Sequence, residues 1–112
     1  MGDIKMKLII AVINKEDKDL TEKRLTEKQY MLTEIGSTGG FLKQKNVSLM
    51  LCIPDESLDE VLDILKTSAG RRMTKAFYPA SVALHGAVSE EYETEIGGCA
   101  VFIMDSARME KF

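Results

Sequence analysis

Apolar residues cluster along the chain in runs whose spacing predicts four strands. Residues 7–13 are apolar on both faces and rich in β-branched side chains, which is typical of a central strand buried on both sides. A second run covers residues 47–53 and ends at Pro54, which cannot donate a hydrogen bond to a neighbouring strand. Residues 97–104 form a third run, and residues 31–37 alternate in part between two faces.

Two segments between these runs have the spacing of amphipathic helices. Residues 20–28 carry a thin apolar stripe, mainly Leu20 and Leu25, so this helix is expected to cover a sheet with one side only. Residues 58–69 repeat apolar side chains at helical spacing and are followed by Gly70, a typical helix stop. The expected N-terminal caps are Asp17 or Asp19 for the first helix and Asp55 or Ser57 for the second.

Two other segments are harder to assign from their pattern. Residues 71–95 show no sustained period, and we expect a long irregular excursion there, with short strands as the alternative. Connections of this length without regular structure are usually functional or mobile. Asp105 or Ser106 is expected to cap a short C-terminal helix that ends at Phe112.

The predicted order is strand, helix, strand, strand, helix, long loop and strand. This βαββαβ order indicates an α+β, ferredoxin-like sandwich, in which two helices cover one face of an antiparallel sheet. Residues 1–112 are expected to form a single domain. Because the other face of the sheet is also apolar, we expect a homo-oligomer whose sheets face one another.

Composition indicates an ordinary globular protein, with 45% apolar and 29% charged residues. The net charge of −3 argues against general nucleic-acid binding, which requires a basic face. A local basic patch remains open, with Lys43, Lys45, Arg71 and Arg72 as its candidates.

The sequence predicts a cytoplasmic protein. Only a short apolar run follows Lys5 and Lys7, so no secretory signal is expected, and no apolar segment has the length of a membrane span. Cys52 and Cys99 lie inside apolar runs and are expected to be reduced, with a disulfide as the minor alternative.

The loop at residues 38–46 carries the residue types that a nucleotide needs. Gly39 and Gly40 allow a ligand to approach the backbone closely. Phe41 offers a ring for base stacking, and the Asn46 carboxamide offers a donor and an acceptor to an adenine edge. The alternative is a plain hairpin connection with Phe41 folded onto the core.

Two sequence motifs, one in this loop and one in the last predicted strand, resemble those of a single protein family. Ser37-Thr38-Gly39-Gly40-Phe41-Leu42 and Gly97-Gly98-Cys99-Ala100-Val101-Phe102-Ile103-Met104, together with the predicted fold order, resemble the PII-like cyclic di-AMP receptors. The resemblance runs nearly from end to end, with residues 71–95 the hardest part to align. It implies a PII-like homotrimer without catalytic activity, which binds a cyclic dinucleotide in the clefts between subunits. The ligand-binding residues that it implies are Thr33, Gly39, Gly40, Phe41, Leu42, Asn46 and Phe102.

Four positions depart from the pattern of that family. Met31 stands where these receptors usually have an arginine, and Gln29 replaces an asparagine. Cys52 replaces a glycine beside the base, and Lys111 replaces a glutamine near the C-terminus. Because charge-assisted bonds to phosphate are strong, the arginine's loss would weaken binding unless Lys43, Lys45 or Lys111 compensates.

Other functions remain open on the sequence. An enzyme is not expected, because the single histidine, His85, has no nucleophile at a diagnostic spacing, and no cluster of metal ligands or resident cofactor is indicated. A PII-type trimer that binds ATP or ADP through Arg71 and Arg72 is one alternative. Another is a trimer that binds no nucleotide and contacts a protein partner through residues 71–95. A copper-tolerance-type trimer shares only the topology.

Overall fold

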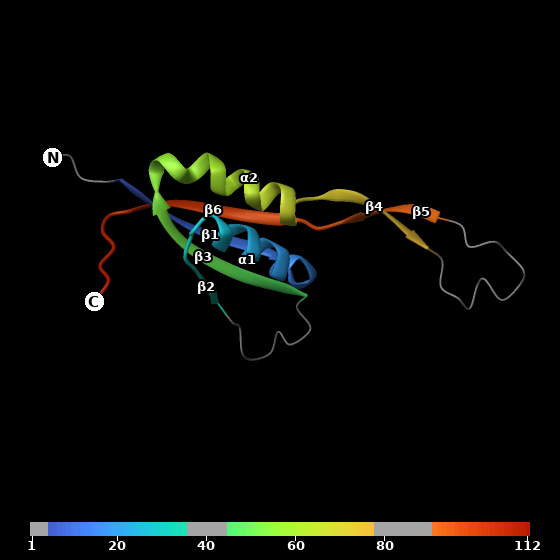
Figure 1. Ribbon diagram of the computed structural model, residues 1–112, viewed down its shortest axis with the longest axis horizontal. Helices are drawn as coiled ribbons and strands as arrows, with labels where there is room; N and C mark the ends of the chain where they lie inside the picture. Colours follow the sequence, from blue (N-terminus) through green and yellow to red (C-terminus); the bar gives the residue numbers. More distant parts are fainter. Residues whose placement is uncertain (1–4, 36–44, 78–90) are drawn as a thin grey trace, which may run out of the picture.

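The computed structural model describes residues 5–35, 45–77 and 91–112, and it has an α+β fold with two helices and antiparallel sheets (Figure 1). The strands are β1 (Met6–Asn14), β2 (Leu32–Ile35), β3 (Asn46–Pro54), β4 (Arg72–Phe77), β5 (Glu91–Ile96) and β6 (Cys99–Ser106). The helices are α1 (Lys18–Glu27) and α2 (Leu58–Ala69), each preceded by one 3-10 turn, at Lys15–Asp17 and Asp55–Ser57.

The main sheet has four strands in the order β2-β3-β1-β6. All three pairings are antiparallel, and β1 lies in the centre as its apolar pattern predicts. Its register runs from Met6 opposite Pro54 to Asn14 opposite Asn46 on one side. On the other side, Met6 pairs with Ser106.

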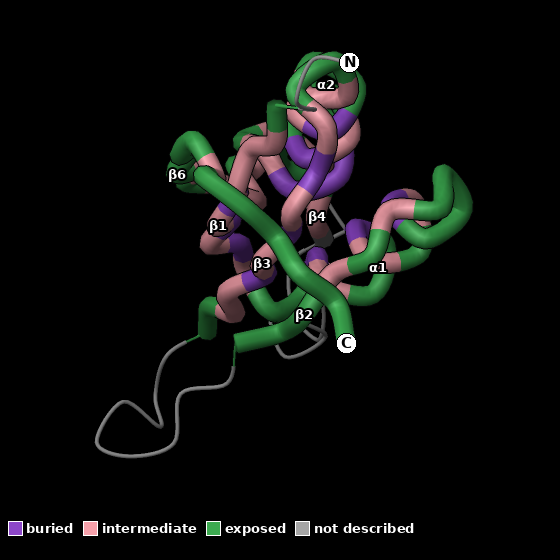
Figure 2. Tube along the Cα trace, turned by 90° about the vertical axis from the view of Figure 1, so that its left-hand side faces the viewer, coloured by how far each residue is buried: buried purple, intermediate pink, exposed green. Residues whose placement is uncertain are grey.

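One face of this sheet and both helices enclose the core. Alternate residues of β1 and β3 are fully buried together with residues of α1 and α2, so the two helices cover the same face, as predicted (Figure 2). The buried apolar residues are Ile9, Ala11, Ile13, Leu25, Leu49, Leu51, Ile53, Val61, Leu65 and Ala69. Leu20 was expected to be buried but is 43% exposed, and Thr21 is buried in its place. The Thr21 hydroxyl donates a hydrogen bond to Ser68 Oγ at 3.0 Å, so both buried hydroxyl groups have a partner.

The opposite face, which we call the open face, is not covered by any element that the structure describes. It carries the remaining alternate residues of the strands, among them Ile10 and Met50, which are half-buried, and Phe102, which is 57% exposed. An apolar face of this kind is unusual for an isolated monomer.

Asp17 and Ser57 occupy the N-cap positions of α1 and α2, as predicted, but neither side chain forms a capping hydrogen bond. The buried carboxylate of Asp17 instead pairs with the guanidinium of Arg72, with 2.5 Å between Asp17 Oδ1 and Arg72 Nη2. Arg72 also donates to the carbonyl of Gly70 at 3.0 Å. Gly70 is the C-cap of α2 and confirms the predicted helix stop.

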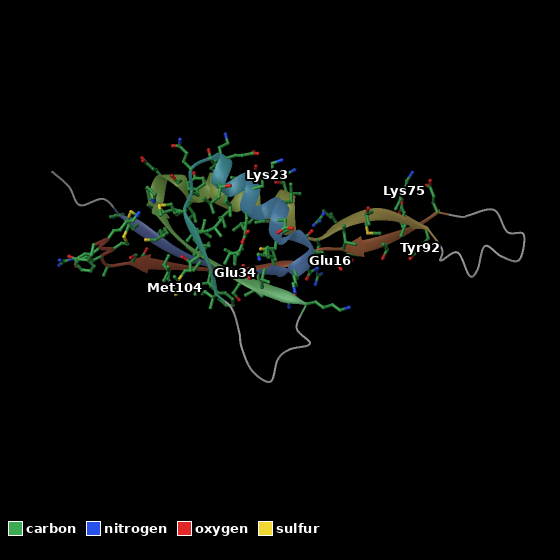
Figure 3. All side chains as sticks on the ribbon, turned by 60° about the horizontal axis from the view of Figure 1, so that its bottom comes forward. Glu16, Lys23, Glu34, Lys75, Tyr92 and Met104 are labelled. Carbon is green, nitrogen blue, oxygen red and sulfur yellow. The ribbon has the colours of Figure 1, made fainter. Side chains whose placement is uncertain are left out.

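Residues 71–95 are more regular than the pattern predicts. β4 and β5 pair along their whole length as a two-stranded hairpin, which projects from the body of the molecule and carries Lys75 and Tyr92 (Figures 1 and 3). The alternative of short strands is therefore confirmed for 72–77 and 91–95, and the irregular interpretation is wrong there.

The predicted C-terminal helix is also wrong. β6 continues to Ser106, and residues 107–112 belong to no helix or strand. Six residues without an apolar stripe are too few to stabilise a helix in water.

Candidate functional site

The open face brings together the predicted ligand-binding residues that the structure describes. Thr33, Asn46 and Phe102 all lie on it, since Thr33 pairs with Met50, and Asn46 and Met50 are even-numbered positions of the same strand. All three side chains are exposed. Gly39, Gly40, Phe41 and Leu42 lie outside the described residues, as does most of the 38–46 loop.

Thr33 and Phe102 occupy opposite edges of the sheet. A single row runs across the four strands, with Met50 and Ile10 between them. Three strand spacings of about 4.8 Å separate the two residues by about 14 Å. A single base therefore does not reach both residues within one chain.

A cleft of about 590 Å³ opens beside Thr33, where the segment between α1 and β2 meets the C-terminal end of the chain. It gathers all four positions that depart from the family pattern, although they are far apart in sequence. Its lining residues are Leu8, Lys28, Gln29, Tyr30, Met31, Leu32, Thr33, Met50, Cys52, Ile53, Pro54, Ser57, Met109 and Lys111.

Charge in this cleft is of one sign. Lys28 and Lys111 line it, and none of the lining residues that the structure describes is an aspartate or a glutamate. Lys111 Nζ lies 3.7 Å from Met31 Sδ, and neither ammonium forms an ion pair with a described carboxylate. In a chain of net charge −3, such a site favours an anion.

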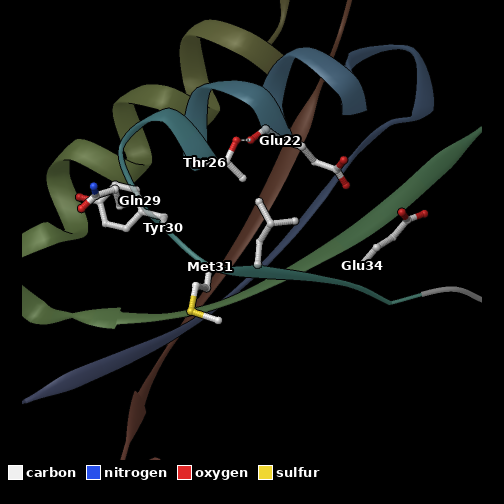
Figure 4. A pocket seen from close by; sticks show the side chains of 7 residues that line it. Glu22, Thr26, Gln29, Tyr30, Met31 and Glu34 are labelled. Atoms are coloured by element: carbon white, nitrogen blue, oxygen red, sulfur yellow. Dashed lines mark hydrogen bonds between the residues drawn. The ribbon is translucent and has the colours of Figure 1, made fainter. Parts of the chain in front are cut away.

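The segment at residues 28–31 also borders a second hollow, of about 510 Å³ (Figure 4). This hollow contains two carboxylates, Glu22 and Glu34, and Glu34 is already paired with Lys18 Nζ at 2.7 Å. Its charge is therefore opposite to that of the cleft beside Thr33, which makes it a poor site for phosphate.

Residues 28–31 separate the cleft from the second hollow, and local backbone geometry fixes their position. Gln29 has a φ of 65°, a left-handed conformation that turns the chain out of α1. The Tyr30 hydroxyl donates to Glu60 Oε1 at 2.9 Å, which ties this turn to α2. A hydrogen bond with Ser57 lowers the pKa of Tyr30, but burial and the Glu60 carboxylate outweigh it and raise the pKa above its usual value.

The two cysteines have different surroundings. Cys52 lines the cleft, whereas Cys99 packs against the core on the other face of the sheet, where burial raises the pKa of its thiol. Both are free thiols, as predicted. Within the described ranges no cluster of His, Cys, Asp and Glu side chains is arranged to hold a metal ion.

The structure does not support the predicted basic patch at Arg71 and Arg72. Arg71 pairs with Glu95 at 3.4 Å, and Arg72 is held by Asp17. Neither arginine lines the cleft, so an ATP site at these two residues would lie elsewhere on the molecule.

Sequence reasoning missed Lys28, Tyr30 and Met109 as lining residues of the cleft. Lys28 and Tyr30 flank Gln29 in sequence, and this adjacency was the available signal. Nothing in the pattern placed Met109 there, because the C-terminal end was expected to be helical.

Comparisons with known proteins agree with this fold. A family model described as "Cyclic-di-AMP receptor" matches residues 6–112. The crystal structure of a functionally unknown protein from Pediococcus pentosaceus ATCC 25745 is similar, with a TM-score of 0.76 and 25% sequence identity. The match covers 98% of this chain and 100% of that one. No helix among the described residues is long and apolar enough to cross a membrane.

Proposed function

The chain belongs to the cyclic-di-AMP receptor family, and from this premise we propose that it is a PII-like signalling protein that binds cyclic di-AMP. The proposal assigns residues 1–112 to one ferredoxin-like domain of a homotrimer. The ligand lies in clefts between subunits and contacts Thr33, Gly39, Gly40, Phe41, Leu42, Asn46 and Phe102. In the cytoplasm, the trimer relays the bound state to a protein partner through residues 38–46 and 71–95.

The observation that carries the proposal is the sign of charge beside Thr33. A cleft with two ammonium groups and no carboxylate among its described lining residues suits the two phosphodiesters of a cyclic dinucleotide. Its volume of about 590 Å³ lies in the usual range for small-ligand sites. Apolar and sulfur-containing side chains complete the lining and suit a purine ring.

The separation of Thr33 from Phe102 supports a site between subunits. These residues lie at opposite edges of one sheet, but in an oligomer the β2 edge of one subunit can meet the β6 edge of the next. Such an assembly would also cover the open face. One assembly would thus bring Thr33 and Phe102 of neighbouring subunits together and also bury the open face, which is why we favour a trimer over an isolated chain.

Titration calorimetry with a panel of nucleotides tests this proposal. Cyclic di-AMP is expected to release heat and to raise the melting temperature, because a ligand that binds only the native state stabilises it. Phe41→Ala is expected to weaken this binding about tenfold or more, through the loss of base stacking.

The control is Leu20→Ala, since Leu20 is an exposed apolar residue of α1 that does not line the cleft. If ATP gives heat and a shift in melting temperature while cyclic di-AMP gives neither, the ligand assignment is wrong.

A second candidate is a protein-interaction module that needs no nucleotide. The observation in its favour is the β4–β5 hairpin, which projects from the body and has neither of the two described helices packed on it (Figure 1). Two-stranded hairpins are only marginally stable alone in water, so a bound partner would be stabilising. Under this alternative, no nucleotide binds, and protease cleavage within residues 71–95 is slowed only by a protein partner.

A further inference from the structure

The last six residues of the chain lie against the cleft in an alternating manner. Met109 and Lys111 line it, whereas Arg108 and Glu110 form an ion pair with each other. The charges of Arg108 and Glu110 therefore offset each other, whereas Lys111 forms no ion pair with a described carboxylate. Its ammonium faces the cleft.

The only partner of the Lys111 ammonium among the described residues is a thioether. Met31 Sδ lies 3.7 Å from Nζ, and sulfur of this kind is a weak acceptor. An ammonium group has three donors, and no carboxylate or carbonyl of the described ranges accepts a hydrogen bond from the other two. The cation is thus placed over Met31 with most of its binding capacity unused.

We infer that Lys111 is the residue that holds the phosphodiester of the ligand in this cleft. The C-terminal segment brings its ammonium over Met31, where it donates charge-assisted hydrogen bonds to a phosphate oxygen. This inference rests on the proposed function, and it identifies the Lys111 ammonium as the positive charge that binds the phosphodiester. Binding then fixes residues 107–112 against the body of the molecule.

The other lysines of this region fit the role less well. Lys28 is the C-cap of α1, where the negative end of the helix dipole offsets part of its charge. Lys45 immediately precedes β3 and does not line the cleft. Lys111 is free of both limitations.

Calorimetry with cyclic di-AMP at low and high salt tests this assignment on three chains. Lys111→Gln is expected to bind about tenfold more weakly than the wild type and to lose most of its salt dependence, because the screened charge is gone. Lys66→Gln is the control, since Lys66 is an exposed residue of α2 outside the cleft, and it is expected to bind as the wild type does.

A rescue variant separates this role from a structural one. Met31 Sδ and Lys111 Nζ lie in contact, so an arginine at position 31 places a cation in the same region. Met31→Arg combined with Lys111→Gln is expected to restore the affinity and its salt dependence. In addition, cyclic di-AMP is expected to slow carboxypeptidase digestion of the wild-type C-terminus severalfold.

The outcomes distinguish the two claims. Equal affinity and salt dependence of the wild type and Lys111→Gln overturn the role of Lys111 and leave the proposed function in place. Digestion at the same rate with and without nucleotide also counts against this role. No heat from the wild type with cyclic di-AMP overturns both the inference and the proposed function.

Discussion

At the scale of single residues, the base of the hairpin depends on two glycines. Gly97 has a φ of 82° and Gly98 a φ of 130°, both in a region that other residues rarely adopt. A Cβ atom at Gly97 would lie 2.2 Å from the carbonyl oxygen of Gly70, whereas one at Gly98 would meet no atom within 4 Å. At Gly97 the backbone of Gly70 therefore occupies the space that a side chain would need.

This difference predicts unequal costs for two similar substitutions. Gly98→Ala is expected to lower the free energy of unfolding by about 1 kcal/mol through backbone strain alone. Gly97→Ala is expected to cost about 3 kcal/mol, because the Gly70 backbone must also move. Urea denaturation at one protein concentration measures both, and equal costs would contradict the close approach.

Single residues also show where sequence reasoning is limited. It selected Thr33, Asn46 and Phe102 from motifs, and the register places all three on one face. It could not identify the contact between Lys111 and Met31, which are 80 positions apart and share no motif. Such a contact depends on where the chain end lies after folding.

At the scale of elements, strong periodicity was the reliable signal. β1, β3 and α2 were predicted because each has an apolar pattern that only one kind of element can bury. The hairpin was anticipated only as the alternative of short strands, because its cross-strand pairs, such as Lys75 opposite Glu93, are mostly polar. Residues 91–96 alternate along β5, but the distance in sequence between β4 and β5 leaves the pairing itself unpredicted.

The attachment of this hairpin to the body is expected to depend on Arg72. Its partner Asp17 is buried, so Arg72→Met leaves a carboxylate without its counter-charge and is expected to cost about 2 kcal/mol. Hydrogen exchange is expected to accelerate in β4 and β5 while β1 and β3 stay protected.

Arg71→Met is the matched control for that change. Arg71 pairs with Glu95, but both side chains are mostly exposed, so the loss is expected to be within about 0.5 kcal/mol. If both variants exchange at the same rate in β4, the Asp17–Arg72 pair does not anchor the hairpin.

At the scale of the whole molecule, the open face predicts the state of assembly. Ile10 lies in the middle of this face, half-buried in the single chain. Light scattering of the wild type is expected to give the mass of a trimer at micromolar concentration. Ile10→Asp is expected to give the mass of a monomer, because a charge in a buried apolar interface is costly.

Leu20→Asp provides the comparison, since Leu20 is an exposed apolar residue of α1 on the other side of the sheet. It is expected to keep the mass of the wild type. A wild-type protein that is monomeric at these concentrations would remove the proposed cleft between subunits.

Four sulfur atoms surround the cleft, from Met31, Met50, Cys52 and Met109. Peroxide converts thioethers to sulfoxides and thiols to sulfenic acids, which turns apolar walls into polar ones. Met31 is 71% exposed and Met109 is 52% exposed, so both are open to this attack. Protein stored in air is therefore expected to become a mixture of chemically different receptors, and mass spectrometry should count the added oxygen atoms before any titration is interpreted.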